Sequence, residues 1–374
     1  MSPRIGYFDV ARGTGILLVV LGHNDLGALS PFLQRLIYSF HIPLFFFLSG
    51  YFINPSIPFR DFFTKRFHTV LKPYLFTIFL IYFASVSFEK MGFQTAIGRI
   101  LKALYGSINY IDWGQLWFLP HLFVVSLYAY IFISVASRFR SRGLRWGLLL
   151  ATLVAAFALL RAFYPFSISI FNRQYEVYGL PFSLDLILLS GFFFILGGEL
   201  KNVVHERTFD NWLILVGAAL GVIVLSYLFP YRVDIAVRVY ESPVVNTLEA
   251  ILGIFLVMGL ARQIDLHSAI LASLFKYLGS ISLIILIFHV PVQAFWSQKV
   301  MAVTNNLPFS IFVGFLMGVL GPVLIHEIFI RFNPVASYWF GRKAEPVTRQ
   351  EIPMKEERTL SKTPGAPAVE SKEH

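Results

Sequence analysis

The chain has 374 residues, of which 56% are hydrophobic, 17% aromatic and 14% charged, and its mean hydropathy is +0.68. A soluble domain carries about 25% charged residues, so this composition excludes a soluble domain and predicts a polytopic integral membrane protein. The net charge of +10 does not indicate nucleic-acid binding, because Lys and Arg are scattered through short loops between apolar runs. The absence of cysteine excludes disulfides and thiolate metal sites.

Apolar runs of about 20 residues predict an all-α architecture of about ten transmembrane helices. The expected spans are 9–28, 35–54, 70–88, 116–136, 144–163, 179–199, 211–230, 244–262, 276–297 and 307–330. The loops after the second and fourth spans hold the densest basic runs and are expected in the cytoplasm. We expect the protein in a bacterial inner (plasma) membrane, and an even number of spans then places both termini on its cytoplasmic side.

The first span carries charge inside the membrane, which costs about 2.5 to 3.5 kcal/mol at mid-bilayer and therefore indicates a functional site. Arg12 and His23 lie eleven positions apart, so on a helix they share one face, about 16 Å apart along the axis. A rival interpretation takes residues 16–21 as the apolar core of a signal peptide behind Arg4. A cleaved segment is not expected to carry this charged pattern.

Two further segments stand out. The longest external loop, 89–115, holds Tyr110 and Trp113, with Trp117 just beyond it, as candidate interfacial aromatics. Residues 341–374 are rich in Glu, Lys, Pro, Ser and Thr without any aromatic residue, which predicts a disordered cytoplasmic tail. We therefore expect a transmembrane domain over residues 1–340 followed by this tail.

Three intramembrane histidines are predicted near one depth. At about 1.5 Å per residue, His23 lies about 8 Å, His41 about 9 Å and His289 about 12 Å inside the outer boundaries of their spans. Each could instead be a core histidine that hydrogen-bonds across helices. For Asp185 and Glu249, at a similar depth, we expect structural roles, with cavity lining or pairing to a histidine as the alternative.

Five segments carry a resemblance to a known family: FDVARGTGILLVVLGH (8–23), FHIPLFFFLSGYF (40–52), FFTKRFHTVLKPY (62–74), LWFLPHLF (116–123) and LGSISLIILIFHVPV (278–292). The chain resembles the membrane-bound acyltransferase family 3, and within it the branch related to fucose 4-O-acetylase. This resemblance implies transfer of an acyl group, most often acetyl, from cytoplasmic acyl-coenzyme A to a carbohydrate or lipid-linked sugar.

The resemblance also implies roles for single residues. Arg12 and His23 match the family's Arg-x10-His signature, with Asp9 three residues before the arginine. Arg66 matches the first arginine of a basic motif, whereas Thr69 stands where the family often has a second arginine. Three basic side chains are available as substitutes: Lys65, His68 and Lys72.

The chemistry of the residues points the same way. Guanidinium groups bind phosphate bidentately, so a cytoplasmic ring of basic side chains is expected to hold the charged end of acyl-CoA. The ring consists of Arg12, Lys65, Arg66 and Lys72. The long neutral arm of the donor then threads toward His23, and histidine suits the removal of a proton from a sugar hydroxyl near neutral pH.

Other parts of the site stay open at this level. His41, His289, Ser49 or a backbone amide could stabilise the oxyanion. Asp9 could orient a base, although its spacing favours an ion pair with Arg12. An acyl-enzyme on Ser49 or Ser282 is the covalent alternative, while the neighbouring Gly50 and Gly279 favour close helix packing.

We therefore expect a membrane O-acyltransferase whose donor is acetyl-CoA or another acyl-CoA, whose acceptor is a glycan or lipid-linked sugar, and which uses no metal. The expected catalytic residues are His23, Asp9, His41 and His289. The alternative from another class is a transporter or flippase of a lipid-linked sugar, because buried His, Asp and Glu also build proton relays. The concentration of the strongest polar motifs in residues 9–74 argues against a transporter. A third interpretation, a protein that only scaffolds an assembly, would leave Arg12 and His23 unexplained.

Overall fold

The structure, a computed structural model, describes residues 6–88, 90–139, 141–170, 173–201, 203–204, 206–342 and 344. The helices of the first half are α1 (Gly6–Gly22), α2 (Leu26–Leu29), α3 (Pro31–Tyr51), α4 (Phe59–Arg66), α5 (Lys72–Phe88), α6 (Phe93–Leu104), α7 (Phe118–Ala136) and α8 (Arg142–Leu159). Those of the second half are α9 (Ile187–Leu200), α10 (Trp212–Leu228), α11 (Pro243–His267), α12 (Ala269–Ser280), α13 (Ser282–Thr304), α14 (Leu307–Ile325) and α15 (Pro334–Trp339).

Shorter elements connect these helices. Two π-helical segments, η1 (Phe67–Leu71) and η7 (His326–Ile330), continue α4 and α14. The 3-10 turns are η2 (Ile108–Tyr110), η3 (Gly114–Trp117), η4 (Pro181–Leu186), η5 (Glu206–Asp210) and η6 (Ile235–Val237). The strands pair antiparallel as β1 (Phe166–Ile170) with β2 (Arg173–Val177) and β3 (Val233–Asp234) with β4 (Val239–Tyr240).

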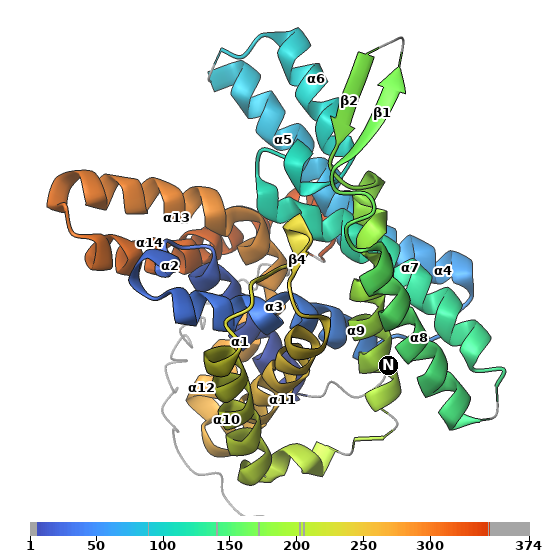
Figure 1. The fold of residues 1–374 in the computed structure, drawn as a ribbon. Helices are drawn as coiled ribbons and strands as arrows, with labels where there is room; N and C mark the ends of the chain where they lie inside the picture. Colours follow the sequence, from blue (N-terminus) through green and yellow to red (C-terminus); the bar gives the residue numbers. More distant parts are fainter. Residues whose placement is uncertain are drawn as a thin grey trace, which may run out of the picture.

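The helices surround a centre formed by α1 and α3 (Figure 1). Helix α1 packs against α3, α11, α12 and α13, and α3 packs against α9 and α11. Helices α10, α11 and α12 lie below this centre in the figure, α7 to α9 lie to its right, and the α13–α14 hairpin projects to the left. The predominantly helical architecture predicted from the composition is confirmed.

Eight helical segments of the described chain are long and apolar enough to cross a membrane. They are Pro31–Tyr51, Phe59–Phe88, Gly114–Ala136, Arg142–Leu159, Pro181–Leu200, Pro243–His267, Ser282–Thr304 and Leu307–Ile330. The predicted span 9–28 differs because α1 ends at Gly22 after 17 residues, and the predicted span 211–230 forms the 17-residue α10. The number of about ten is therefore not confirmed, and the predicted span 276–297 is divided between α12 and α13 at Ile281.

Glycines let central helices approach one another closely. A Cβ built on Gly279 of α12 would collide with the backbone carbonyl of Asp9 on α1, and one on Gly50 of α3 would collide with the carbonyl of Phe194 on α9. Small residues at such contacts are typical of helix packing in membranes. The packing role predicted for Gly50 and Gly279 is confirmed.

The segments expected outside the membrane are folded. Residues 89–115 contain α6, and residues 164–178 contain the β1–β2 hairpin. The aromatic residues there serve internal packing, since Trp113 packs its ring against Phe288. Trp117 is 3% exposed and stacks on His121, so the prediction of an interfacial anchor is wrong for Trp117: its indole is held inside the protein.

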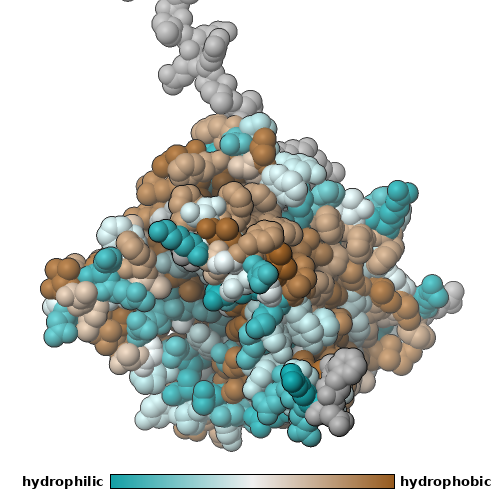
Figure 2. All heavy atoms as spheres, turned by 90° about the horizontal axis from the view of Figure 1, so that it is seen from above, coloured by the Kyte–Doolittle hydropathy of each residue, from teal (hydrophilic) through white to brown (hydrophobic). Residues whose placement is uncertain are grey.

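The surface exposes many large apolar side chains, including Phe83, Ile270 and Val303, each at least 70% exposed. Figure 2 shows hydrophobic side chains over the upper part of the view and hydrophilic ones gathered over its centre and lower part. Such extensive apolar exposure fits contact with lipid. The predicted tail, apart from residues 341, 342 and 344, lies outside the described residues, as does Arg140 of the predicted cytoplasmic loop.

Candidate active site

One cavity joins Arg12 to His23. Arg12, Ile16 and Val19 of α1 line it, as does His23 directly after the helix, so the cavity follows one face of α1 for about 16 Å. This arrangement confirms the shared helix face predicted from the spacing of the two residues. Side chains from α3, η1, η3, α7 and α13 complete the walls, and those that carry polar atoms are His41, Ser49, Thr69, Gln115, Trp117 and Ser282.

Three histidines meet where the cavity reaches the end of α1: His23 and His41 line it, whereas His289 is fully buried and does not line it. The ring centroid of His23 lies 6.3 Å from that of His41 and 5.3 Å from that of His289. Tyr38 borders this cluster, with its ring centroid 4.9 Å from His41 and 6.2 Å from His23. The structure thus brings together the three histidines that the sequence predicts at one depth.

The hydrogen bonds of His41 and His289 define their tautomers. Each Nδ1 lies 2.9 Å from a backbone carbonyl of its own helix, that of Ile37 for His41 and those of Ile285 and Leu286 for His289. A carbonyl can only accept, so Nδ1 carries the proton and Nε2 offers a lone pair. The buried Nε2 of His289 has no hydrogen-bond partner among the described residues.

His121 gives the contrasting case of a structural histidine. Its Nδ1 donates to the carbonyl of Phe182 and its Nε2 accepts from the hydroxyl of Ser190. Both ring nitrogens are therefore satisfied inside the protein, as is expected of a buried polar group with a packing role. The free nitrogen of His289 sets it apart from this pattern.

Bonds to two neighbouring helices hold the end of α1 in place. The side-chain amide of Gln293 on α13 donates to the backbone carbonyl of His23 at 2.6 Å. The amide of Asn24 donates to the carbonyl of Ile311 on α14, also at 2.6 Å. Because His23 follows the last residue of α1, these contacts fix its position directly.

A proline on α13 helps to shape the wall beside His289. Pro291 has no N–H, so the carbonyl of Ile287, four residues earlier, lacks its usual helical partner. The side-chain amide of Gln115 donates to this carbonyl at 2.9 Å. The break in the helical hydrogen bonding thereby ties η3 to α13 next to the histidines.

Arg12 lines the opposite end of the cavity, and Arg66 lies near Arg12 without lining the cavity itself. Arg12 donates to the carboxylate of Asp9 at 2.9 Å and lies over the ring of Phe52. Arg66, at the end of α4, contacts aromatic rings and lies close enough to Arg12 for their charges to repel. Among the described residues Arg66 forms no ion pair, whereas Arg12 pairs with Asp9, so the region keeps a net positive charge and suits an anion.

Other residues predicted for the site lie elsewhere. Lys72 is 6% exposed and its Nζ lies 3.5 Å from the ring centre of Tyr338, outside the cavity lining. Lys65 is exposed and does not line the cavity either. Asp9 lies about 21 Å from His23 along α1, so it positions Arg12 and does not orient the histidine; the same-turn ion pair predicted for Asp9 is confirmed.

The two candidate serines line the cavity away from the histidines. Ser49 lies eight residues beyond His41 on α3, and Ser282 lies seven residues before His289 on α13. These separations correspond to about 12 Å and about 10 Å along the helices. Both hydroxyls therefore lie beside the path between the arginines and the histidine cluster.

The two intramembrane acids have structural partners, as expected. Asp185 forms a bidentate ion pair with Arg238, in which the two side chains are 0% and 1% exposed. Glu249 accepts hydrogen bonds from Ser226 and Asn246. Neither acid lines the cavity.

Sequence reasoning did not identify Gln115, Gln293 or Tyr38 as parts of the site. A signal was present for Gln293, because a polar amide inside an apolar span needs a hydrogen-bond partner. Which partner each glutamine finds depends on contacts between residues 172 and 270 positions apart, and no local pattern reveals these.

Comparisons with known proteins bear on the family. No curated protein and no solved structure matches the chain. The acyltransferase domain of acyltransferase family 3 matches residues 5–327, which is most of the chain and includes every wall of the cavity. The match does not distinguish branches, so the resemblance to the fucose 4-O-acetylase branch stays a prediction. The chain belongs to acyltransferase family 3 and is a membrane acyltransferase.

Proposed function

We propose that this protein transfers an acyl group, most simply acetyl, from cytoplasmic acyl-CoA to a hydroxyl of a surface glycan or lipid-linked sugar. The observation that carries the proposal is the single cavity lined by Arg12 at one end and by His23 at the other. Acyl-CoA has a matching polarity, because its nucleotide and pyrophosphate are anionic while the thioester lies at the end of a long neutral arm.

The donor end of the cavity suits phosphate. Arg12 and Arg66 present guanidinium groups, which bind phosphate oxygens in pairs. The π-helical segment η1 follows Arg66 and contributes Thr69 and Val70 to the wall, and such segments often occur at functional sites. Apolar side chains of α1, α3 and α7 between the two ends suit the neutral arm.

At the other end, His23 acts as a general base. Its imidazole removes the proton from the acceptor hydroxyl, and the oxygen attacks the carbonyl carbon of the thioester. The tetrahedral intermediate collapses with cleavage of the carbon–sulfur bond, and the coenzyme A thiolate takes up the proton from the imidazolium. His41 and His289 carry their proton on Nδ1 and have a lone pair on Nε2, so in this tautomer Nε2 cannot donate a hydrogen bond to the oxyanion.

The positions of the serines favour direct transfer. A covalent acyl-enzyme on Ser49 or Ser282 would hold the acyl group about 10 to 12 Å along the helices from His41 and His289. His23, which lies beside these two histidines, would then be too far from the acyl-serine ester to activate an acceptor hydroxyl for attack on it. The family supports a transferase and gives no support to a transporter or flippase, so we keep this one function.

The direct test is transfer of label by the purified chain in lipid nanodiscs. Acetyl-CoA labelled in its acetyl group is mixed with a glycolipid extract from the host membrane, and the products are separated by chromatography. The proposal predicts label in the glycan fraction that mild alkali releases as acetate. If the folded protein leaves all of the label in acetyl-CoA after the glycolipid extract has been added, this result contradicts the proposal.

A further inference from the structure

A second, polar pocket lies on the other side of Tyr38 from the histidines. Its lining comes from the first turns of α3 and from the β3–β4 segment, and consists of Gln34, Arg35, Tyr38, Arg232, Asp234 and two valines. Tyr38 belongs to this lining and also contacts the rings of His41 and His23. The tyrosine therefore borders both the pocket and the histidine cluster at the reacting end of the donor cavity.

One face of α3 forms part of the pocket wall. Gln34, Tyr38 and His41 follow one another at spacings of four and three residues, which places them on the same side of a helix. Arg35 lies six residues, or about 9 Å along the axis, from His41. A molecule held by Arg35 thus lies alongside Tyr38 and points toward the histidine cluster.

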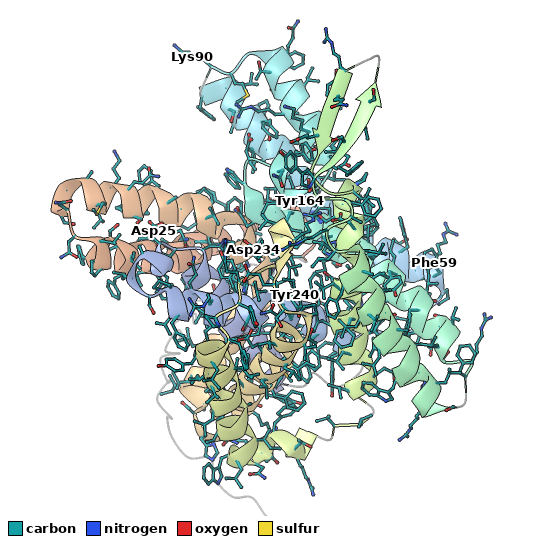
Figure 3. All side chains as sticks on the ribbon, in the orientation of Figure 1. Asp25, Phe59, Lys90, Tyr164, Asp234 and Tyr240 are labelled. Carbon is teal, nitrogen blue, oxygen red and sulfur yellow. The ribbon has the colours of Figure 1, made fainter. Side chains whose placement is uncertain are left out.

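The other wall of the pocket is anchored within the protein. Asp234 accepts a hydrogen bond from the backbone of Ala236 and so caps η6. Arg238, four residues after Asp234, is held by its buried ion pair with Asp185 and lies over the ring of Tyr164, with its guanidinium carbon 4.6 Å from the ring centroid. Figure 3 shows Asp234 and Tyr240 in the centre of the molecule, away from Phe59 and Lys90 at its edges.

The charged groups of the pocket leave hydrogen-bond donors unused. Among the described residues, the buried Nε of Arg35 has no hydrogen-bond partner, and neither Arg35 nor the guanidinium of Arg232 forms an ion pair. Asp234 interacts electrostatically with Arg232, while burial raises the pKa of its carboxyl. Arg35 also lies near the charge of Glu249, but that acid is 2% exposed and already bonded to Ser226 and Asn246.

We propose that this pocket binds the acceptor and that the acceptor is a sugar bearing an oxyanion, either a carboxylate or a phosphate. The guanidinium groups of Arg35 and Arg232 hold the oxyanion, because paired N–H donors match carboxylate and phosphate geometry. Tyr38 offers an aromatic face to the sugar ring. This inference rests on the proposed function and specifies the substrate class of the same site.

The test compares methyl β-D-glycosides that differ only in the group at carbon 6. Methyl β-D-glucuronide and methyl β-D-glucoside 6-phosphate serve as oxyanion-bearing probes and methyl β-D-glucoside as the neutral one. Binding to the chain in nanodiscs is measured by saturation-transfer NMR, and transfer from labelled acetyl-CoA gives kcat/KM for each probe. The variants are Arg35→Gln and Arg232→Gln, with Arg173→Gln on the exposed β2 as the matched control.

We expect at least one charged probe to bind at least tenfold more tightly than the neutral one, and the carboxylate and phosphate arms identify which group is preferred. Arg35→Gln and Arg232→Gln should each reduce this preference about tenfold or more, since charge-assisted bonds are lost, and Arg173→Gln should keep it. Equal binding of all probes, or a preference that survives both variants, would overturn the inference. Selective binding without any transfer would support the pocket and count against the proposed function.

Discussion

At the scale of single residues, helical periodicity predicts relations within one element. The spacing of Arg12 and His23 places them on one face, and the cavity runs along that face. Counting depth along separate spans predicts that His41 and His289 lie near the level of His23, and the ring distances show that the three also come together. The position of Lys72 could not be predicted in this way, because it depends on Tyr338 of α15, which packs against α5.

The arginines at the donor end allow a test of single contacts. Arg66→Ala should weaken apparent donor affinity about ten- to hundredfold, because a charge-assisted contact with phosphate is lost. The measurement is the KM for acetyl-CoA at a saturating acceptor concentration. Lys65→Ala removes an exposed charge from the same helix and should change KM little. An unchanged KM in Arg66→Ala would contradict the role of Arg66 in donor binding.

At the scale of elements, long apolar runs predict helices well because length and hydropathy are local properties. The ends of elements are less predictable. Helix α1 stops at Gly22, where Asn24 and the backbone of His23 bond to α14 and α13, and α13 starts anew after Ile281. Such breaks depend on neighbouring helices, and so does the folding of the segments 89–115 and 164–178, which we expect outside the membrane.

Close contacts between helices give a prediction at this scale. Gly279→Ala places a methyl group against the backbone carbonyl of Asp9, so α1 and α12 must separate, at a cost of about 1 to 3 kcal/mol. Gly217→Ala on α10 is the matched control, because a Cβ there meets nothing within 4 Å. Thermal unfolding in one detergent should show a lower midpoint for Gly279→Ala and an unchanged or higher one for Gly217→Ala; equal midpoints would refute the packing role.

At the scale of the whole molecule, the proposed function has the donor and the acceptor reach the histidine cluster from opposite sides. The arginine end of the cavity lies near α4, whereas the polar pocket beyond Tyr38 is formed by the β3–β4 segment. Composition predicts a membrane protein and the basic loops predict its orientation. The relation between the two binding regions emerges only from the folded chain.

The orientation is testable because the chain has no native cysteine. A cysteine at Arg138, in the basic loop after α7, should react with an impermeant maleimide only after the membrane is opened. A cysteine at Arg173 on β2 should react in intact cells. Labelling of the Arg138 position from outside would show that the predicted orientation is reversed.

The most direct test of the central claim is acyl transfer by His23→Gln. Glutamine can keep a hydrogen bond but cannot take up a proton, and loss of a general base costs about 10² to 10⁴ in rate. His267→Gln, at the end of α11 and away from the cavity, is the matched control. With both variants folded and binding acetyl-CoA normally, the account predicts that transfer falls by this factor in His23→Gln and stays normal in His267→Gln. Near-normal transfer by folded His23→Gln would contradict it.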